Sequence, residues 1–237
     1  MDYAKISFAV ISTWIFASGV SPPNPMLKQE NRAKMKGALE QGSFYQYVHL
    51  YLITPVVFAT IAEACLIMTR QDPSNGAGQL ASLFFIYKSG DAMSMRLSKF
   101  NALGGLMMII GGSMRLWTFR ALGRYFTYQV GIQENQKLIQ DGLYSVVRHP
   151  AYSAIIFGYP GCVLWNLAPG SWVRESGVLS TWPGKILFTL HSSLLVAAPF
   201  LTLLRMPQED EVLKNHFGEQ WEVWAQRVRY RIIPGVY

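Results

Sequence analysis

The chain has 237 residues, of which 51% are hydrophobic and only 15% are charged. A typical soluble domain is about 25% charged, so this composition excludes an ordinary soluble domain and indicates a helical membrane bundle. The net charge of +7 is spread over the loops, which favours membrane topology and attraction to anionic lipid over nucleic-acid binding.

Five apolar segments are predicted to form membrane helices, at residues 4–20, 46–68, 100–120, 151–168 and 183–204. Most of them approach the roughly 20 residues that a helix needs to cross the hydrocarbon core. The first is short, so a cleaved signal peptide is an alternative interpretation of it. In the fourth, Pro160-Gly161 would permit a kink or a re-entrant bend.

Within and between these segments, local patterns predict packing rather than chemistry. A short surface helix is expected from Leu80 to Tyr87 in the long loop 69–99. The pairs Gly104-Gly105 and Gly111-Gly112 are expected to let membrane helices approach closely. Cys65 and Cys162 lie in apolar segments without metal-ligand spacing, which favours buried packing cysteines over a disulfide or a metal site.

Three polar side chains inside the predicted spans need partners. His49 and His191 are expected to be hydrogen-bonded packing groups rather than ligands. Glu63 is a lone carboxylate in the second span, and Arg115 is one candidate for its partner.

The C-terminal tail is amphipathic. Apolar residues recur there at helical spacing, at Leu213, Phe217, Trp221, Trp224 and Val228. Two compatible interpretations follow: a helix at the membrane interface with its tryptophans at headgroup level, or a helix that also closes a site. Gly218 is expected to interrupt this helix.

Basic residues are distributed unevenly between the two sides of the predicted bundle. The connections 21–45 and 121–150 and the tail 205–237 together hold twelve lysines and arginines, against six on the other side. Because cytoplasmic loops carry the excess of basic residues, the first side is predicted to be cytosolic, with the N-terminus opposite.

The first of two polar clusters runs from Gly142 to Tyr152, on the side predicted to be cytosolic. It contains Tyr144, Arg148, His149 and Tyr152 beside an apolar segment, where ionisable groups are costly and usually functional. A structural alternative is that His149 merely precedes the first proline of a helix. Together these donors and aromatic faces suit a polar ligand with an aromatic ring and a cationic centre.

The second cluster follows the last apolar segment. Arg205 and Glu209 are four residues apart and could form an ordinary intrahelical pair. Alternatively, Arg205 grips an anionic substrate group in bidentate fashion while Glu209 meets an ammonium group. Pro207 fits the start of a new helix, where the acidic residues that follow would complement the helix dipole.

Four elements in this order resemble a known family. They are Gly142-x-Tyr144-x-x-x-Arg148-His149-Pro150-x-Tyr152, Arg205-x-x-x-Glu209, Phe217-Gly218-Glu219-Gln220-Trp221 and Ile233-Pro234-Gly235. The chain resembles the isoprenylcysteine carboxyl methyltransferase family, part of a wider group of integral-membrane methyltransferases that includes phospholipid N-methyltransferases. The resemblance covers about residues 100–237, whereas residues 1–99 match only in being hydrophobic.

The resemblance implies an all-α integral membrane protein of about five transmembrane helices, with a cytosolic cofactor pocket closed by a C-terminal amphipathic helix. Residues 1–99 would supply N-terminal membrane helices and loops, and residues 100–237 the methyltransferase core, within a single membrane domain. The implied reaction is S-adenosylmethionine-dependent methylation of the prenylated C-terminal cysteine carboxylate of lipidated proteins, giving a methyl ester. The implied location is a multi-pass protein of the endoplasmic reticulum membrane in a eukaryote, or of the plasma membrane in a prokaryote, with membrane lipids as neighbours.

The resemblance also implies the site residues. The cofactor pocket would be lined by Gln129, Gln136, Lys137, Leu138, Ile139, Tyr144, His149, Pro150, Ala151, Tyr152 and Glu209. Arg205 would orient the substrate carboxylate and is the one residue assigned to catalysis, because a carboxylate is already ionised at neutral pH and needs no base. One departure is Ala154, where the family usually has glycine.

Three alternatives stay open. A phospholipid N-methyltransferase would methylate an amine, for which an arginine that grips a carboxylate has less purpose. A sterol-reductase-like enzyme that uses NADPH is suggested by residues 228–234, which also resemble the end of that family. A non-enzymatic membrane scaffold would make both polar clusters structural. No metal site is predicted, and no nucleic-acid partner.

Overall fold

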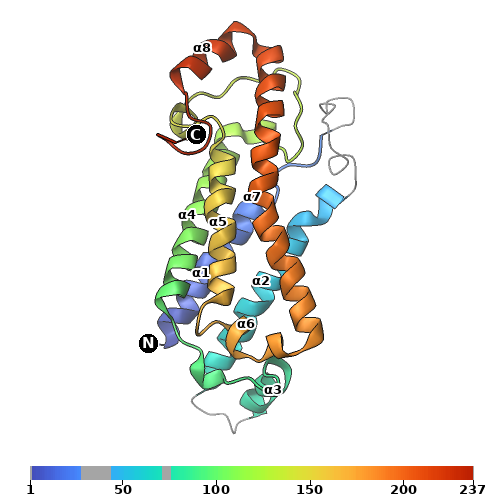
Figure 1. Ribbon diagram of the computed structural model, residues 1–237, viewed down its shortest axis with the longest axis vertical. Coiled ribbons are helices and arrows are strands. Elements are labelled where there is room, and N and C mark those ends of the chain that lie inside the picture. Colours follow the sequence, from blue (N-terminus) through green and yellow to red (C-terminus); the bar gives the residue numbers. More distant parts are fainter. Residues whose placement is uncertain (1, 28–43, 71–75, 237) are drawn as a thin grey trace.

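The computed structural model describes residues 2–27, 44–70 and 76–236, and this part of the chain is helical with no β-strand (Figure 1). In chain order, the α-helices are α1 (Asp2–Val20), α2 (Phe44–Thr69), α3 (Gly76–Phe85), α4 (Lys99–Leu122), α5 (Pro150–Leu167), α6 (Trp172–Glu175), α7 (Trp182–Phe217) and α8 (Glu219–Arg227). Helix α3 corresponds to the predicted surface helix and begins four residues earlier than expected. The C-terminus and α8 lie at one end of the bundle, here called the α8 end, and the N-terminus, α3 and α6 lie at the opposite end.

Four helices in the described part are long and apolar enough to cross a membrane, over Tyr3–Val20, Tyr47–Thr69, Lys99–Tyr125 and Trp182–Phe217. The fourth predicted segment forms α5, which has 18 residues and runs without interruption through Pro160. It lies alongside α4 and α7 (Figure 1). The predicted all-α membrane fold is therefore confirmed, with four candidate spans and α5 packed beside two of them.

The glycines of α4 allow its neighbours to approach closely. A Cβ atom at Gly111 would lie 2.6 Å from the carbonyl oxygen of Ala154 in α5, and one at Gly112 would lie 2.6 Å from that of Ile15 in α1. Real Cβ atoms do not come this close to backbone atoms, so only glycine permits these two contacts. The predicted close packing of membrane helices at the glycine pairs is confirmed.

Helix α7 is much longer than the predicted segment 183–204. It continues through Pro199 and Pro207 to Phe217, so the expectation that Pro207 begins a new helix is wrong. Its 36 residues span about 54 Å at 1.5 Å per residue, well beyond the roughly 30 Å of a hydrocarbon core. Gly218, with φ 55°, ends α7 as predicted and separates it from α8.

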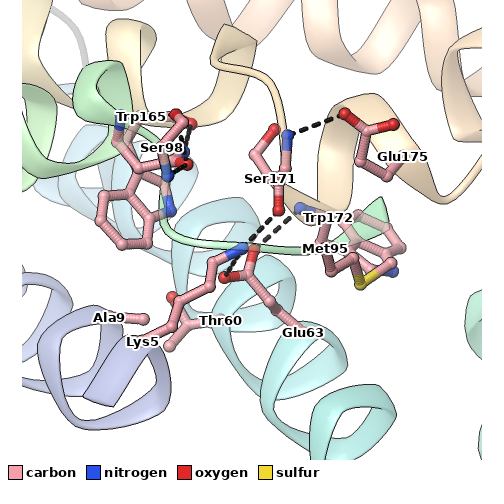
Figure 2. Close-up of polar contacts among 12 residues, drawn as sticks. Lys5, Ala9, Thr60, Glu63, Met95, Ser98, Trp165, Ser171, Trp172 and Glu175 are labelled. Atoms are coloured by element: carbon pink, nitrogen blue, oxygen red, sulfur yellow. Dashed lines mark hydrogen bonds and ion pairs between the residues drawn. The ribbon is translucent and has the colours of Figure 1, made fainter. Parts of the chain in front are cut away.

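The partner of Glu63 is Lys5, and the candidate Arg115 is wrong. Lys5 is 1% exposed, and its Nζ lies 2.9 Å from Glu63 Oε1 and also donates to the carbonyl of Gly170. Figure 2 shows the two side chains pointing toward one another from α1 and α2, beside the turn that begins α6. Arg115 is out of reach because its Nε donates to the carbonyl of Gly19, at the other end of α1.

The remaining predictions of buried packing residues hold for Cys162 and His191, whereas Cys65 is only half-buried. Cys65 and Cys162 are both free, and Cys162 is fully buried. His191 is buried and its Nε2 lies 3.0 Å from the carbonyl oxygen of Leu52, so it links α7 to α2 as a hydrogen-bonded packing group.

Candidate active site

A cavity of about 290 Å³ opens among the helices toward the α8 end. Its walls come from α2, α4, α5, α7 and α8 and from the connection between α4 and α5, and Val20 of α1 contributes as well. Residues from the predicted N-terminal part (1–99) and from the predicted core (100–237) therefore line the same cavity.

The structure brings most of the predicted site residues to this cavity. Those that line it are Gln129, Gln136, Lys137, Leu138, Ile139, Tyr144, His149, Ala151, Tyr152, Arg205 and Glu209. Pro150 does not line it and instead occupies the first turn of α5, where its ring is buried. His49, predicted to be a packing group, also faces the cavity.

The two polar clusters meet directly. The Tyr152 hydroxyl donates to Glu209 Oε2 at 2.5 Å, and His149 Nε2 lies 2.9 Å from Asp210 Oδ1. The rings of His149 and Tyr152 stack with an interplanar angle of 10° and centroids 5.4 Å apart. Adjacent carboxylates on α7 therefore hold a stacked pair of rings on the first turn of α5.

Asp210 is a functional candidate that sequence reasoning missed. It is 6% exposed, and its carboxylate contacts three basic side chains: His149, Arg148 through Nη1 at 3.3 Å, and Arg231 through Nε at 3.2 Å. In the sequence it was one of several acidic residues assigned to a helix dipole. The available signal was its position directly after Glu209, within a cluster already selected for its charges.

The C-terminal segment crosses the start of α5. The amides of Arg148 and His149 donate to the carbonyls of Tyr230 (3.0 Å) and Arg231 (2.8 Å). The Ser153 hydroxyl donates to the carbonyl of Ile232 at 2.6 Å. The segment thus satisfies backbone groups that the helix start leaves without an intrahelical partner.

Helix α8 covers the site with its tryptophans. Trp221 and Trp224 are 9% and 2% exposed, and Trp224 Nε1 donates to the carbonyl of Tyr144 at 3.1 Å. Both rings pack inward against Tyr144 and Leu138, which favours the interpretation of α8 as a helix that closes a site. Burial, and secondarily the charge of Glu209, raises the pKa of the Tyr144 phenol, so it stays a neutral donor.

Arg205 and Glu209 each contact another part of the cavity wall. Arg205 Nη2 donates to the carbonyl oxygen of Tyr128 at 2.5 Å, while Glu209 accepts from Tyr152. Both residues line the cavity, one turn apart on α7. Each of the two side chains therefore makes its own contact with a different part of the cavity wall.

Comparison with known proteins supports the motif resemblance. Residues 104–168 match the sequence model of the isoprenylcysteine carboxyl methyltransferase (ICMT) family. The resemblance to the ICMT family is confirmed. The match includes the first polar cluster and the helices α4 and α5 that frame the cavity.

Two named relatives extend the ICMT match. The chain is 34% identical over 128 residues to a probable protein-S-isoprenylcysteine O-methyltransferase of Oryza sativa subsp. japonica, covering 53% of this chain and 57% of the relative. It is 32% identical over 127 residues to protein-S-isoprenylcysteine O-methyltransferase B of Arabidopsis thaliana, covering 53% and 55%. The aligned region thus spans little more than half the length of these curated relatives.

A shorter match points to another family. The chain is 42% identical over 41 residues to a 7-dehydrocholesterol reductase of Arabidopsis thaliana, covering 16% of this chain and 10% of the relative. This match is much shorter than the matches to the two methyltransferases, so the family resemblance rests on the methyltransferase matches.

The cavity wall has polar groups that are available to a ligand. Gln129 Oε1 accepts from the amide of Leu27 at 3.1 Å, but the buried Gln129 Nε2 has no hydrogen-bond partner among the described residues. An unmatched buried donor is costly, and a ligand acceptor in the cavity would satisfy it. With the carboxylate of Glu209 and the rings of His149 and Tyr152, the wall suits a ligand that combines an aromatic ring with a cationic centre.

Proposed function

We propose that this protein methylates the prenylated C-terminal cysteine of lipidated proteins, with S-adenosylmethionine as the donor and a methyl ester as the product. The observation that carries the proposal is the Tyr152–Glu209 contact, which joins the two polar clusters in the wall of one cavity. The names of the relatives support the same chemistry.

Each side chain has a role in holding the donor. The stacked rings of His149 and Tyr152 offer a flat surface to a base, and Gln129 offers a free amide donor. Glu209, held by Tyr152, supplies negative charge for a cationic centre. The run 136–139 is assigned backbone contacts to the donor, and Pro150 is assigned to shaping the start of α5 rather than to contact.

When bound, S-adenosylmethionine supplies a methyl group on a positively charged sulfur, which a nucleophile displaces in line. The residues around it then act by position rather than by proton transfer. Arg205 orients the acceptor carboxylate and offsets part of its desolvation, and no base is needed because that carboxylate is ionised at neutral pH. Trp224 and Phe217 shield the site from water.

Apolar side chains in the cavity wall favour an acceptor that is attached to a lipid. Leu52 of α2, Ile155 of α5 and Leu194 and Leu201 of α7 line the cavity, and α2 and α7 are candidate spans. An apolar chain delivered from the bilayer would be accommodated against these side chains.

The proposed orientation places the α8 end in the cytosol. The connection 121–149, α8 and the C-terminus gather at this end, opposite the N-terminus (Figure 1). The sequence assigns twelve basic residues to this side, eight of them among the residues that the structure describes, against six on the other side. In a eukaryotic cell, the proposed location is the endoplasmic reticulum membrane. We retain the division into membrane helices before residue 99 and a methyltransferase core after it, within one membrane domain.

In the direct test, purified protein is incubated with methyl-labelled S-adenosylmethionine and one of two acceptors, N-acetyl-S-farnesylcysteine or phosphatidylethanolamine. Methylation of the first, with a label that alkali releases as methanol, is the expected result. Alkali-stable label on phosphatidylethanolamine would instead identify a phospholipid N-methyltransferase. Binding of NADPH without binding of S-adenosylhomocysteine would favour the reductase alternative.

Arg205→Ala provides a sharper prediction for the acceptor side. We expect at least roughly tenfold loss of methyl transfer, because the acceptor carboxylate loses a charged hydrogen-bond partner. Calorimetry should show S-adenosylhomocysteine binding that is nearly unchanged. Equal loss of transfer and of donor binding would contradict the assigned role.

A further inference from the structure

Arg115 is a buried cation that the proposed mechanism leaves unused. It lies in the candidate span α4, is 4% exposed and lines the cavity. No carboxylate of the described residues forms an ion pair with it. A charge placed inside a membrane protein is costly, so it is a functional candidate by default.

The guanidinium is held firmly in place by neutral groups. Arg115 Nε donates to the carbonyl of Gly19 at 2.9 Å, and Nη1 donates to that of Ala151 at 3.2 Å. Its Cζ lies 5.2 to 5.5 Å from the ring centroids of Phe119, Phe126 and Tyr128. The Tyr128 side chain is a further hydrogen-bond partner of the guanidinium. These neutral contacts orient the group without neutralising its charge, and they do not use all five of its N–H groups.

The charges around the cavity suggest what that ligand group is. Both molecules of the proposed reaction carry a carboxylate: the amino-acid end of the donor and the C-terminus of the acceptor. Three arginines line the cavity, and Arg148 already faces the carboxylate of Asp210. Arg205 is assigned above to the acceptor carboxylate, and Arg115 is the third arginine. Arg115 faces the ring of Tyr128, and Arg205 donates to the carbonyl of the same residue.

We propose that Arg115 is a second carboxylate-binding residue of this cavity. The inference rests on the proposed methyl transfer and deepens it. The carboxylate can belong to the donor or to the acceptor, and the experiment distinguishes the two sources. Because Arg115 also contacts the backbone at Gly19 and Ala151, the bound carboxylate would be linked to the end of α1 and to the first turn of α5.

The test compares two ligands on Arg115→Met, which keeps a long side chain and removes its charge. S-adenosylhomocysteine has the amino-acid carboxylate, and 5′-methylthioadenosine has the same adenosine thioether without it. If Arg115 binds the donor, calorimetry should show roughly tenfold weaker S-adenosylhomocysteine binding with 5′-methylthioadenosine affinity unchanged. If it binds the acceptor, both affinities persist and the KM for N-acetyl-S-farnesylcysteine should rise by a similar factor.

Two control variants separate charge recognition from folding. Arg115→Lys keeps a cation and should retain part of whichever selectivity Arg115→Met loses. Arg120→Met removes an exposed arginine from the same helix and should change neither affinity nor KM. Equal weakening of both adenosine ligands in both Arg115 variants, or no change in either affinity or in KM, would overturn the inference. If the wild-type protein did not bind S-adenosylhomocysteine, that result would instead contradict the proposed function itself.

Discussion

The charge of Glu209 and its hydrogen bond can be tested separately. In Glu209→Gln the side chain can still accept from Tyr152, but it no longer attracts a cation. We expect S-adenosylmethionine, whose sulfur is charged, to bind roughly tenfold more weakly, and S-adenosylhomocysteine, whose sulfur is neutral, to lose much less. Isothermal titration with both ligands measures the difference.

Tyr152→Phe is the matched control for that pair. It removes the hydroxyl that lies 2.5 Å from Glu209 Oε2 but keeps the carboxylate charge and the ring stacked on His149. Both ligands should therefore weaken by a similar factor. If Glu209→Gln also weakened the two ligands equally, its role would be to position Tyr152 rather than to attract the sulfonium.

At the scale of helices, the contact between α4 and α5 depends on the absence of a side chain. Gly111→Ala would place a Cβ atom 2.6 Å from the backbone of α5 at Ala154 and Gly158. Overpacking of this kind costs roughly 1–3 kcal/mol, and here the first turn of α5 carries the site. We expect a lower midpoint of thermal unfolding in detergent and weaker donor binding.

Gly76→Ala is the control for added volume. A Cβ atom there meets nothing within 4 Å, and no positive φ is recorded for this residue. The change should shift stability by less than about 1 kcal/mol. A similar loss of stability in the two variants would mean that the close approach of α4 and α5 is not what Gly111 provides.

The sequence predicted the helices well because hydrophobic length is a local property. The predicted segment 183–204 is too short because it ends where the apolar stretch ends, whereas α7 continues through Arg205 and Glu209 to Phe217. Pro207 was misread for a related reason. A proline removes only one helical hydrogen bond, and a long helix can tolerate that loss.

The site was predictable as a set of residues but not as a network. The motifs identified most of the cavity wall, because residue type and spacing carry that information. The contacts of Asp210 with Arg148 and Arg231, and the environment of Arg115, join segments far apart in the chain. No local pattern specifies such contacts, and the misassigned partner of Glu63 has the same origin.

For the molecule as a whole, the end opposite α8 is held together by a buried ion pair. Lys5 and Glu63 join α1 to α2, and the amide of Trp172 donates to Glu63 Oε2 at 2.8 Å. Removing one partner of a buried pair leaves an uncompensated charge and costs about 3–5 kcal/mol. Lys5→Met should therefore lower the unfolding midpoint strongly.

The double variant Lys5→Met/Glu63→Gln tests the cause of that loss. It removes both charges and keeps an acceptor for the Trp172 amide, so much of the stability should return. A double variant as unstable as Lys5→Met would show that packing or the Lys5 contact with Gly170, rather than the unpaired charge, determines the loss.

The proposed orientation of the whole bundle rests on one asymmetry of the sequence, the excess of basic residues in the segments assigned to the cytosolic side. In a protein with Cys65 and Cys162 replaced by alanine, new cysteines at the exposed positions Ser145 and Met93 mark the two ends. In sealed vesicles with their cytosolic face outward, a membrane-impermeant maleimide should label Ser145→Cys at once and Met93→Cys only after detergent is added. The reverse pattern would place the cavity mouth on the other side of the membrane, away from prenylated proteins that are made in the cytosol. Labelling of both positions before detergent would mean that the two ends do not lie across the bilayer.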